Sequence, residues 1–347
     1  MNNPVIAVAL SGGVDSLVSG YLLKEKYKQV FGIHFLTGYE KEPVDSSLLE
    51  QQLGFPVTCI DLSRLFEEKV ISYFIETYIE GKTPNPCIVC NKDIKFGELL
   101  TQAQKMGADY LATGHYATVY NGFSFPEKII NQAYLGKAFD ALKDQSYFLS
   151  MLNSRQLEKI IFPLAGMKKE KVKAFAKTKN IRPIQPSESQ DICFIHDNDL
   201  SKFIQEKNKI KFEQGNIVDM DGKTVGQHNG LHQFTIGQRK GINSPASEAY
   251  YVKRIDIKNN ILEVCFKKDL STKSFHVGEI NWNDADREII PDIITKIRYS
   301  HKGAFSTLKR KGSLGEVIFH EPQNAVTPGQ AAVFYKEARV LGAGIIQ

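Results

Sequence analysis

The first third of the chain alternates short apolar runs with segments of helical spacing. Continuous apolar runs are typical of strands that are buried on both faces, and their alternation with amphipathic helices indicates a parallel sheet covered on both sides. Residues 154–180 are again predicted to be mostly helical. The apolar runs occupy residues 4–10, 29–36, 55–62 and 108–114, and the helical segments occupy 17–26, 46–54, about 63–80 and 91–107.

The helical periodicity disappears near Lys207. Short apolar runs separated by turn residues continue to the C-terminus, a pattern that favours antiparallel sheets or small barrels. We predict an α/β domain with a parallel sheet over residues 1–206, a small mainly-β domain over 207–270 and a C-terminal β-barrel over 271–347. The short runs lie at residues 215–220, 231–237, 249–257, 261–266, 292–299, 315–320, 331–335 and 338–346.

The size and composition of the chain fit two or three globular domains. It has 347 residues, of which 42% are hydrophobic and 24% charged, and this balance argues against intrinsic disorder. No apolar stretch is long enough to span a membrane. The N-terminus lacks the basic start of a signal peptide. We therefore expect no membrane association and a cytoplasmic, reducing location.

The net charge is mildly positive and permits a polyanionic partner. Lysine and arginine number 44 against 39 acidic residues, a formal net charge of +5. Residues 168–179 alone hold six lysines and one glutamate. This segment fits a solvated helix face. It also fits a surface for nucleic-acid phosphates, with Lys168, Lys169, Lys171 and Lys173 as the contacts.

The hexapeptide SGGVDS at residues 11–16 lies between the first predicted strand and the first predicted helix. Its two glycines allow a tight turn, and the free N–H groups of such a loop converge on an anion. Asp15 is unusual in an anion site and suggests a Mg²⁺ ion held through phosphates. The loop resembles the pyrophosphate loop (PP-loop) of the N-type ATP pyrophosphatases, which split ATP and attach AMP to a carbonyl oxygen. The resemblance implies ATP-dependent adenylation of an unspecified substrate.

The chain has five cysteines, an odd number that does not suggest a disulfide framework. Cys59 and Cys265 lie in apolar runs and are expected in the core. Cys87 and Cys90 follow a proline-bounded segment and precede a helix, whose N-terminus is expected to lower a thiol pKa. Together with Cys193, they fit a zinc site, inert structural thiols or catalytic sulfur chemistry.

Seven segments together resemble the bacterial tRNA-specific 2-thiouridylases, in the same order and over nearly the whole chain. This resemblance implies an adenine nucleotide alpha hydrolase-like ATP-pyrophosphatase domain, a small central domain and a C-terminal β-barrel. It also implies ATP-dependent 2-thiolation of the wobble uridine 34 of the tRNAs for lysine, glutamate and glutamine, with AMP and pyrophosphate as products. The segments are residues 83–91, 112–117, 143–149, 189–194, 230–241, 296–299 and 327–335.

The same resemblance assigns roles to individual residues. Cys193 would carry a persulfide sulfur supplied by a cysteine desulfurase or a relay protein. Cys90 would be the nucleophile that releases this sulfur, leaving a transient Cys90–Cys193 disulfide. The implied ATP contacts are Ala9, Leu10, Ser11, Gly12, Gly13, Val14, Asp15, Ser16, Phe35 and Gly114. The implied target-base contacts are Asn85, Pro86 and Cys87, and the implied tRNA contacts are His115, Lys143, Asp144, Gln145, Arg298, Tyr299 and Gln330.

One position departs from the family pattern, because Cys87 stands where the family usually has an aspartate. A thiol does not reproduce the hydrogen bonding of a carboxylate, so the acid–base role of this position is left open. Another ATP pyrophosphatase and a non-catalytic RNA-binding protein are the rival functions. The intact SGGVDS loop together with Cys90 and Cys193 argues against the non-catalytic alternative.

Overall fold

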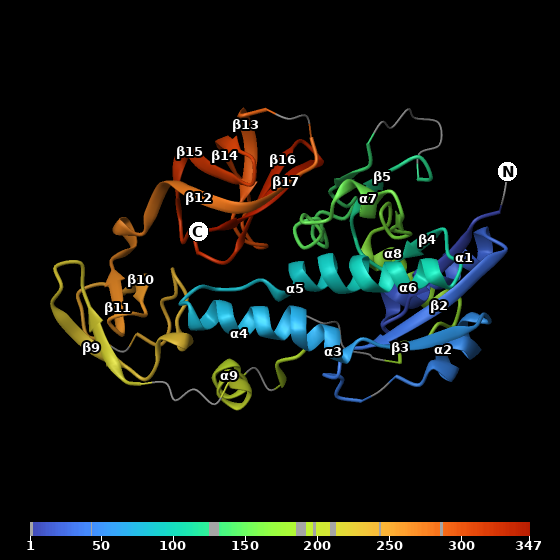
Figure 1. Cartoon of the computed structure of the whole chain (residues 1–347), viewed down its shortest axis with the longest axis horizontal. Coiled ribbons are helices and arrows are strands. Elements are labelled where there is room, and N and C mark those ends of the chain that lie inside the picture. Colours follow the sequence, from blue (N-terminus) through green and yellow to red (C-terminus); the bar gives the residue numbers. More distant parts are fainter. Residues whose placement is uncertain are drawn as a thin grey trace.

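The computed structural model describes residues 3–42, 44–124, 132–184, 192–196, 199–208, 213–242, 244–284 and 287–347. Within these residues the chain forms three units (Figure 1): an α/β unit with a parallel sheet, a middle unit with a small sheet, and a closed C-terminal β-barrel. The predicted fold class is confirmed.

The parallel sheet of the first unit has the strand order β3-β2-β1-β4-β7 among the described residues. Alternate residues of its central strand β1 point into two different cores, which explains why its sequence is continuously apolar. The chain leaves β1 first toward β2 and β3, and later adds β4 on the other side. The carboxyl ends of β1 and β4 therefore flank the topological switch point, where ligands bind in sheets of this kind. The strands are β1 (Val5–Ala9), β2 (Gln29–Leu36), β3 (Val57–Asp61), β4 (Tyr110–Ala112) and β7 (Ile160–Ile161).

Helices cover both faces of this sheet. One face is covered by α1 (Val14–Lys26), α2 (Ser46–Leu53) and α8 (Lys169–Thr178). The other face is covered by two helical rods that pack together. None of the described helices has the length and apolarity to cross a membrane. The first rod comprises α3 (Ser63–Phe66), η1 (Glu67–Ile71) and α4 (Ser72–Ile79), and the second comprises α5 (Pro86–Val89), η2 (Cys90–Glu98) and α6 (Leu99–Lys105). A short helix α7 (Ser154–Leu157) precedes β7.

The middle unit is a four-stranded sheet of order β10-β11-β8-β9 in the described chain. The run 231–237 was predicted as a strand, and this prediction is wrong: Leu231–Gln233 form the 3₁₀ turn η4. The cause is that Leu231 and Phe234, three residues apart, both point into the core, as in a helical turn. The elements are α9 (Leu200–Asn208), β8 (Gly215–Val218), β9 (Thr224–His228), β10 (Tyr251–Asp256), β11 (Ile261–Cys265) and η5 (Lys267–Asp269).

The C-terminal unit is a barrel of six strands, closed by pairing of β12 with β17. Its strand β17 also pairs with β6 (Tyr134–Gly136), which in turn pairs with β5 (Thr118–Tyr120) of the α/β unit. The barrel is thereby fixed to the first unit by backbone hydrogen bonds. The barrel strands are β12 (Ser271–Trp282), β13 (Ile289–Lys296), β14 (Ala304–Lys311), β15 (Leu314–Asn324), β16 (Ala331–Lys336) and β17 (Arg339–Ile346).

Candidate functional site

The predicted phosphate loop lies at the switch point of the sheet, directly after β1. The loop after β4 packs against it through Gly114. A Cβ atom at Gly114 would lie 2.8 Å from the carbonyl carbon of Asp15 and 2.9 Å from the amide nitrogen of Ser16. Only glycine allows two backbones to approach so closely. Two predicted ATP-binding segments, about 100 residues apart in the sequence, are thus in contact.

The hydrogen bonds of the loop fix its turn and leave its open side to a ligand. Gly12 adopts a φ of +79°, in the left-handed region. The Ser16 hydroxyl donates to the Gly13 carbonyl at 2.9 Å and accepts from the Ser11 amide at 3.2 Å. Gly13 is the N-cap of α1 and supplies no side-chain acceptor. Because helix N-termini without a side-chain cap present N–H groups to anions, this geometry fits a phosphate.

Asp15 is held by two side chains from other parts of the chain. One carboxylate oxygen accepts from the Tyr116 hydroxyl at 2.8 Å, and the other lies 2.6 Å from the Lys169 ammonium. Lys169 is only 7% exposed. The prediction that Lys169 contacts nucleic acid from a basic helix face is therefore wrong. Lys168, Lys171 and Lys173 of the same segment are exposed, and their role as phosphate contacts stays a prediction.

This arrangement does not fit direct binding of Mg²⁺ by Asp15. Both of its carboxylate oxygens are engaged by protein groups. The described residues also contain no group of three or more histidine, cysteine or acidic side chains that could hold a metal ion. The described part of the chain therefore provides no cage for the magnesium ion expected from the sequence.

Phe35 lies on the same sheet edge as the phosphate loop. It is near the carboxyl end of β2, the strand that pairs with β1, and it lies opposite Ile60 of β3. Its ring is half-buried and packs against the core on the face of the sheet that the two helical rods cover. The position agrees with a nucleotide contact, although no neighbouring group identifies an adenine.

The segment that leads to Cys87 is held by all three units. Asn85 caps helix α5, with its side-chain oxygen accepting from the Ile88 amide at 3.4 Å. The Gln330 side-chain amide of the barrel donates to the carbonyls of Thr83 and Pro84, both at 3.0 Å. Both N–H donors of that amide are thereby used, so only its oxygen is left for the predicted tRNA contact. The Thr83 hydroxyl also bonds to Thr235 of the middle unit at 3.2 Å.

Cys193 is positioned by the residue that follows it. Phe194 is 2% exposed and lies in an aromatic cluster, with its ring centroid 5.0 Å from that of Phe74, 5.3 Å from Phe203 and 5.9 Å from Phe66. These rings come from the first helical rod and from α9. The anchored phenylalanine fixes the segment that carries Cys193. The preceding motif residues 189–191 lie outside the described residues.

The three candidate thiols lie close enough to influence one another. The Cys87 side chain is exposed at the surface, but its surroundings partly desolvate it, and this desolvation together with a charge on Cys193 raises its pKa to about 11. Burial also raises the pKa of Cys90 to about 12, and charges on Cys193 and Cys87 act in the same direction. Cys193 is also exposed at the surface, and partial desolvation by its surroundings raises its pKa. The structure thus brings together three cysteines that span more than 100 residues of sequence.

The expectation that the helix N-terminus lowers these pKa values is wrong for the protein without substrates. The helix begins at Pro86, so Cys90 lies a full turn inside it and does not face the free N–H groups. Burial then has the larger effect. A further expectation fails at Cys59, which is exposed because β3 is the edge strand of its sheet. Cys265 is 2% exposed, so its predicted place in the core is confirmed.

Lys95 is a site residue that the sequence analysis missed. Its positive charge lowers the pKa of all three thiols against the effect of burial. It lies five residues after Cys90 on η2, a π-helical segment in which residues five apart share a face. Lys95 also helps burial to lower the pKa of His115 well below its usual value. Its charge therefore acts on the thiols and on the residue that follows Gly114.

His115 itself is neutral at physiological pH, because burial holds its pKa low. Its Nδ1 atom is hydrogen-bonded to the Thr113 hydroxyl at 2.7 Å, and its ring contacts Phe96 and Phe162. A neutral ring does not attract a phosphate. A role in binding tRNA would therefore use stacking or a hydrogen bond.

The other predicted tRNA residues meet where the barrel contacts the α/β unit. Tyr299 is 40% exposed and lies against Phe148, with 4.6 Å between ring centroids. Arg298 has a buried Nη1 with no hydrogen-bond partner in the described structure, which leaves a donor for a ligand. The Asp144 carboxylate accepts from the backbone amides of Ala138 and Ser146, and the Gln145 side-chain oxygen accepts from the Tyr116 amide. The Lys143 amide donates to the Asp140 carbonyl in the same turn.

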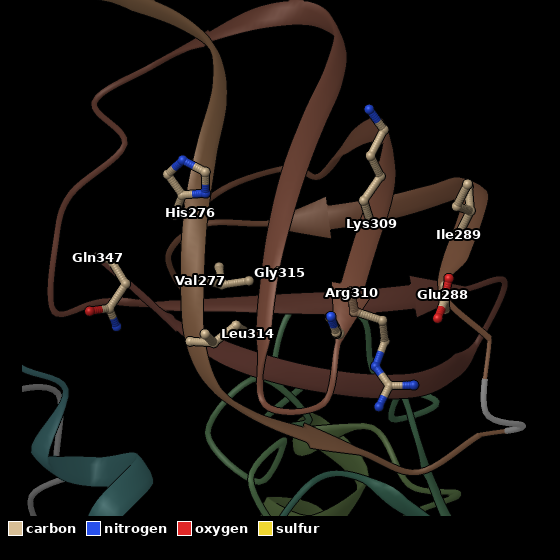
Figure 2. A pocket seen from close by; sticks show the side chains of 10 residues that line it. His276, Val277, Glu288, Ile289, Lys309, Arg310, Leu314, Gly315 and Gln347 are labelled. Atoms are coloured by element: carbon tan, nitrogen blue, oxygen red, sulfur yellow. The ribbon is translucent and has the colours of Figure 1, made fainter.

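Figure 2 shows a cavity on the outside of the barrel. It has a volume of about 450 Å³, and its lining includes Lys309, Arg310 and Lys311. The Arg310 side chain donates to the backbone carbonyls of Arg287 and Gly312, and its Cζ atom lies 5.2 Å from the centre of the Trp282 ring. No predicted site residue lines this cavity, so the candidate site is the cysteine and phosphate-loop region of the α/β unit.

Comparison with known proteins places these features in a family. Family models match residues 4–197, described as a tRNA methyl transferase HUP domain, 201–266, a tRNA methyl transferase PRC-barrel domain, and 272–346, an aminomethyltransferase β-barrel domain. A tRNA-specific 2-thiouridylase MnmA of Desulfosudis oleivorans is 42% identical and covers 100% of this chain and 96% of its own length. The enzymes of that name from Syntrophotalea carbinolica and Desulfotalea psychrophila are 39% and 38% identical over 99% of this chain and 99% and 98% of their own.

A solved structure of a 4-thiouridine synthetase–RNA complex with bound ATP shows a weak likeness, with a TM-score of 0.33. It is 17% identical and covers 59% of this chain and 50% of its own.

Proposed function

This chain belongs to the family of tRNA-specific 2-thiouridylases, and on that premise we propose that it uses ATP to replace the C2 oxygen of uridine 34 by sulfur in the tRNAs for lysine, glutamate and glutamine. The observation that carries the proposal is that Cys87, Cys90 and Cys193 lie near enough for their charges to act on one another, in a domain whose sheet edge carries a loop with the geometry of an anion site. The products are 2-thiouridine, AMP and pyrophosphate, and the expected location is the cytoplasm.

The first step is activation of the uracil. The C2 oxygen is a poor leaving group, and its attack on the α-phosphorus of ATP makes it a good one while pyrophosphate departs. Residues 9–16, Phe35 and Gly114 would hold the nucleotide, with the loop N–H groups on the phosphates. In this proposal Mg²⁺ would enter the site bound to the phosphates of ATP. No step is assigned to a metal ligand on the protein, because Asp15 is engaged with Tyr116 and Lys169.

The second step delivers sulfur. A cysteine desulfurase or relay protein would load Cys193 as a persulfide, Cys193–S–SH. After Cys90 loses its proton, its sulfur attacks the Sγ atom of Cys193, the inner sulfur of the persulfide; the S–S bond to the outer sulfur breaks and hydrosulfide leaves with the electron pair. Hydrosulfide then attacks C2 and AMP departs. The Cys90–Cys193 disulfide that remains is reduced by a thiol reductant before the next turnover.

The tRNA would contact the surface between the barrel and the α/β unit. Arg298 offers an unused buried donor there, and Tyr299 offers a half-exposed ring on which a base can stack. His115, residues 143–145 and Gln330 complete the proposed contacts. Asn85, Pro86 and Cys87 would lie against the target base. Since the pKa of Cys87 is about 11, this residue is neutral at physiological pH and does not replace the charge of a family aspartate.

The test is a reaction with purified protein, a lysine tRNA transcript, ATP and a persulfide donor. We expect equal amounts of pyrophosphate and 2-thiouridine, measured by enzyme-coupled assay and by mass spectrometry of the digested tRNA. A transcript with cytidine at position 34 is the matched control and should release no pyrophosphate. Because the family models are described as methyl transferases, a parallel reaction supplies S-adenosylmethionine. A methylated uridine without 2-thiouridine would refute the proposal.

A further inference from the structure

The phosphate loop contains a carboxylate whose partner lies far away in the sequence. Asp15 belongs to the first turn of α1, at the point where the loop presents its N–H groups. Lys169 is the first residue of α8, 154 residues later, and its ammonium lies 2.6 Å from Asp15. The same ammonium lies 5.8 Å from the centre of the Tyr116 ring, whose hydroxyl donates to the other oxygen of Asp15.

Charge explains why such a partner is needed. A carboxylate beside an anion-binding loop repels the phosphates of ATP, and repulsion between like charges is strong where water is partly excluded. The Asp15 side chain is 30% exposed and that of Lys169 is 9% exposed, so the pair is shielded from solvent. A buried ammonium removes this repulsion. The backbone of Lys169 is itself fixed, since its amide donates to the Asp140 side chain at 2.9 Å.

We propose that Lys169 is a positioning residue of the nucleotide site, which neutralises Asp15 and, with Tyr116, holds it so that the loop accepts the phosphates of ATP. This inference rests on the proposed use of ATP. It replaces the magnesium ion that the sequence suggested as the partner of Asp15 by an ammonium of the chain itself. It also gives a function to the one buried lysine of a segment whose other described lysines are exposed residues.

The test measures ATP binding at equilibrium, by calorimetry without tRNA, and tRNA-dependent pyrophosphate release in parallel. Lys169→Met should weaken ATP binding by at least about 30-fold, because the carboxylate is left without its counter-charge. Lys169→Arg should bind within a few-fold of the wild type. Lys177→Met, an exposed lysine of the same helix, is the matched control and should bind ATP like the wild type.

The double variant Asp15→Asn, Lys169→Met decides how Lys169 acts. With no carboxylate to repel phosphate, it should bind ATP markedly better than Lys169→Met alone. If it binds no better, or if folded Lys169→Met binds like the wild type, the inference is refuted. Circular dichroism checks folding, and if Lys169→Met does not fold, the arginine and double variants provide the test. Wild-type protein that binds ATP but forms no 2-thiouridine would refute the proposed function and leave this inference standing.

Discussion

Substitution of Gly114 by alanine tests whether the contact between the two loops shapes the nucleotide site. The new Cβ would lie 2.8 Å from the Asp15 carbonyl carbon, 2.9 Å from the Ser16 amide nitrogen and 3.0 Å from the Asp15 carbonyl oxygen. All three are backbone atoms of the phosphate loop and its helix. No flexible side chain can move aside, so one of the two backbones must shift.

The size of the shift sets the expected effect. An ordinary contact begins at 3.4 Å, so the backbone at 2.8 Å must retreat by about 0.6 Å. A hydrogen bond to a charged group contributes about 1.5–3 kcal/mol and depends steeply on geometry. A shift of this size should cost the equivalent of one loop–phosphate bond, about 2–3 kcal/mol. This corresponds to roughly 30- to 150-fold weaker ATP binding.

The assay compares the dissociation constant of ATP and the KM for ATP in tRNA-dependent pyrophosphate release. Gly122→Ala is the matched control, because nothing lies within 4 Å of its added Cβ. We expect the control to match the wild type, and Gly114→Ala to lose ATP affinity while it still binds tRNA. A folded Gly114→Ala protein that binds ATP within threefold of the wild type would show that the contact does not shape the site.

Three further predictions concern the thiols and the segment that precedes them. Lys95→Met should slow alkylation of Cys90 at pH 8–9 by about tenfold, because loss of the positive charge raises the thiol pKa further, while Lys92→Met on the same helix should leave the rate unchanged. In the wild type, the alkylation rate of Cys90 should rise about tenfold per pH unit up to pH 10 or above, since a pKa of about 12 leaves the thiol protonated below that range. A plateau of the rate near pH 8 would contradict this. Cys90→Ser should abolish 2-thiouridine formation but not ATP binding, whereas Cys87→Ser should retain measurable thiolation in single-turnover mass spectrometry; the opposite pattern would mean that the nucleophile is Cys87. Gln330→Leu removes two hydrogen bonds, to the carbonyls of Thr83 and Pro84. It should lower the rate of thiolation and leave the affinity for ATP, measured by calorimetry, unchanged.

The parallel sheet could be predicted because its strands are apolar on both faces. The run at residues 29–36 coincides with β2 as the structure has it. The same logic failed for Cys59, since an apolar run does not reveal that its strand lies at the edge of the sheet. It also missed β5 and β6, which are three residues each and pair with each other, with β6 paired in turn to the distant barrel strand β17. Short strands that depend on a distant partner leave little local pattern.

The candidate site divides in the same way. The turn between β1 and α1 is local, so six consecutive residues were sufficient to predict its form, while its binding of phosphate stays a prediction. Lys95 was not identified and Lys169 was assigned to the wrong partner, because a lysine in a helical segment has the same local pattern whether it faces solvent or a buried partner. Spacing gave one unused signal, since Lys95 follows Cys90 by five residues and shares its face only in a π-helix. The identity of the helix type is decided by packing and not by the local sequence.

The two halves of the proposed reaction therefore depend on different levels of structure. Nucleotide binding is organised by a turn and a helix start within one sheet, and its contacts stay within the α/β unit. The cysteine segment is bonded to the barrel at Thr83, whose backbone amide donates to the Pro328 carbonyl at 2.9 Å. The residue after Pro328 is Gly329, and a side chain there would place its Cβ only 2.8 Å from the Thr83 carbonyl oxygen. The barrel thus fixes the backbone just before the helix of Cys87 and Cys90, and in the proposed reaction this contact would help to place the thiols against the base.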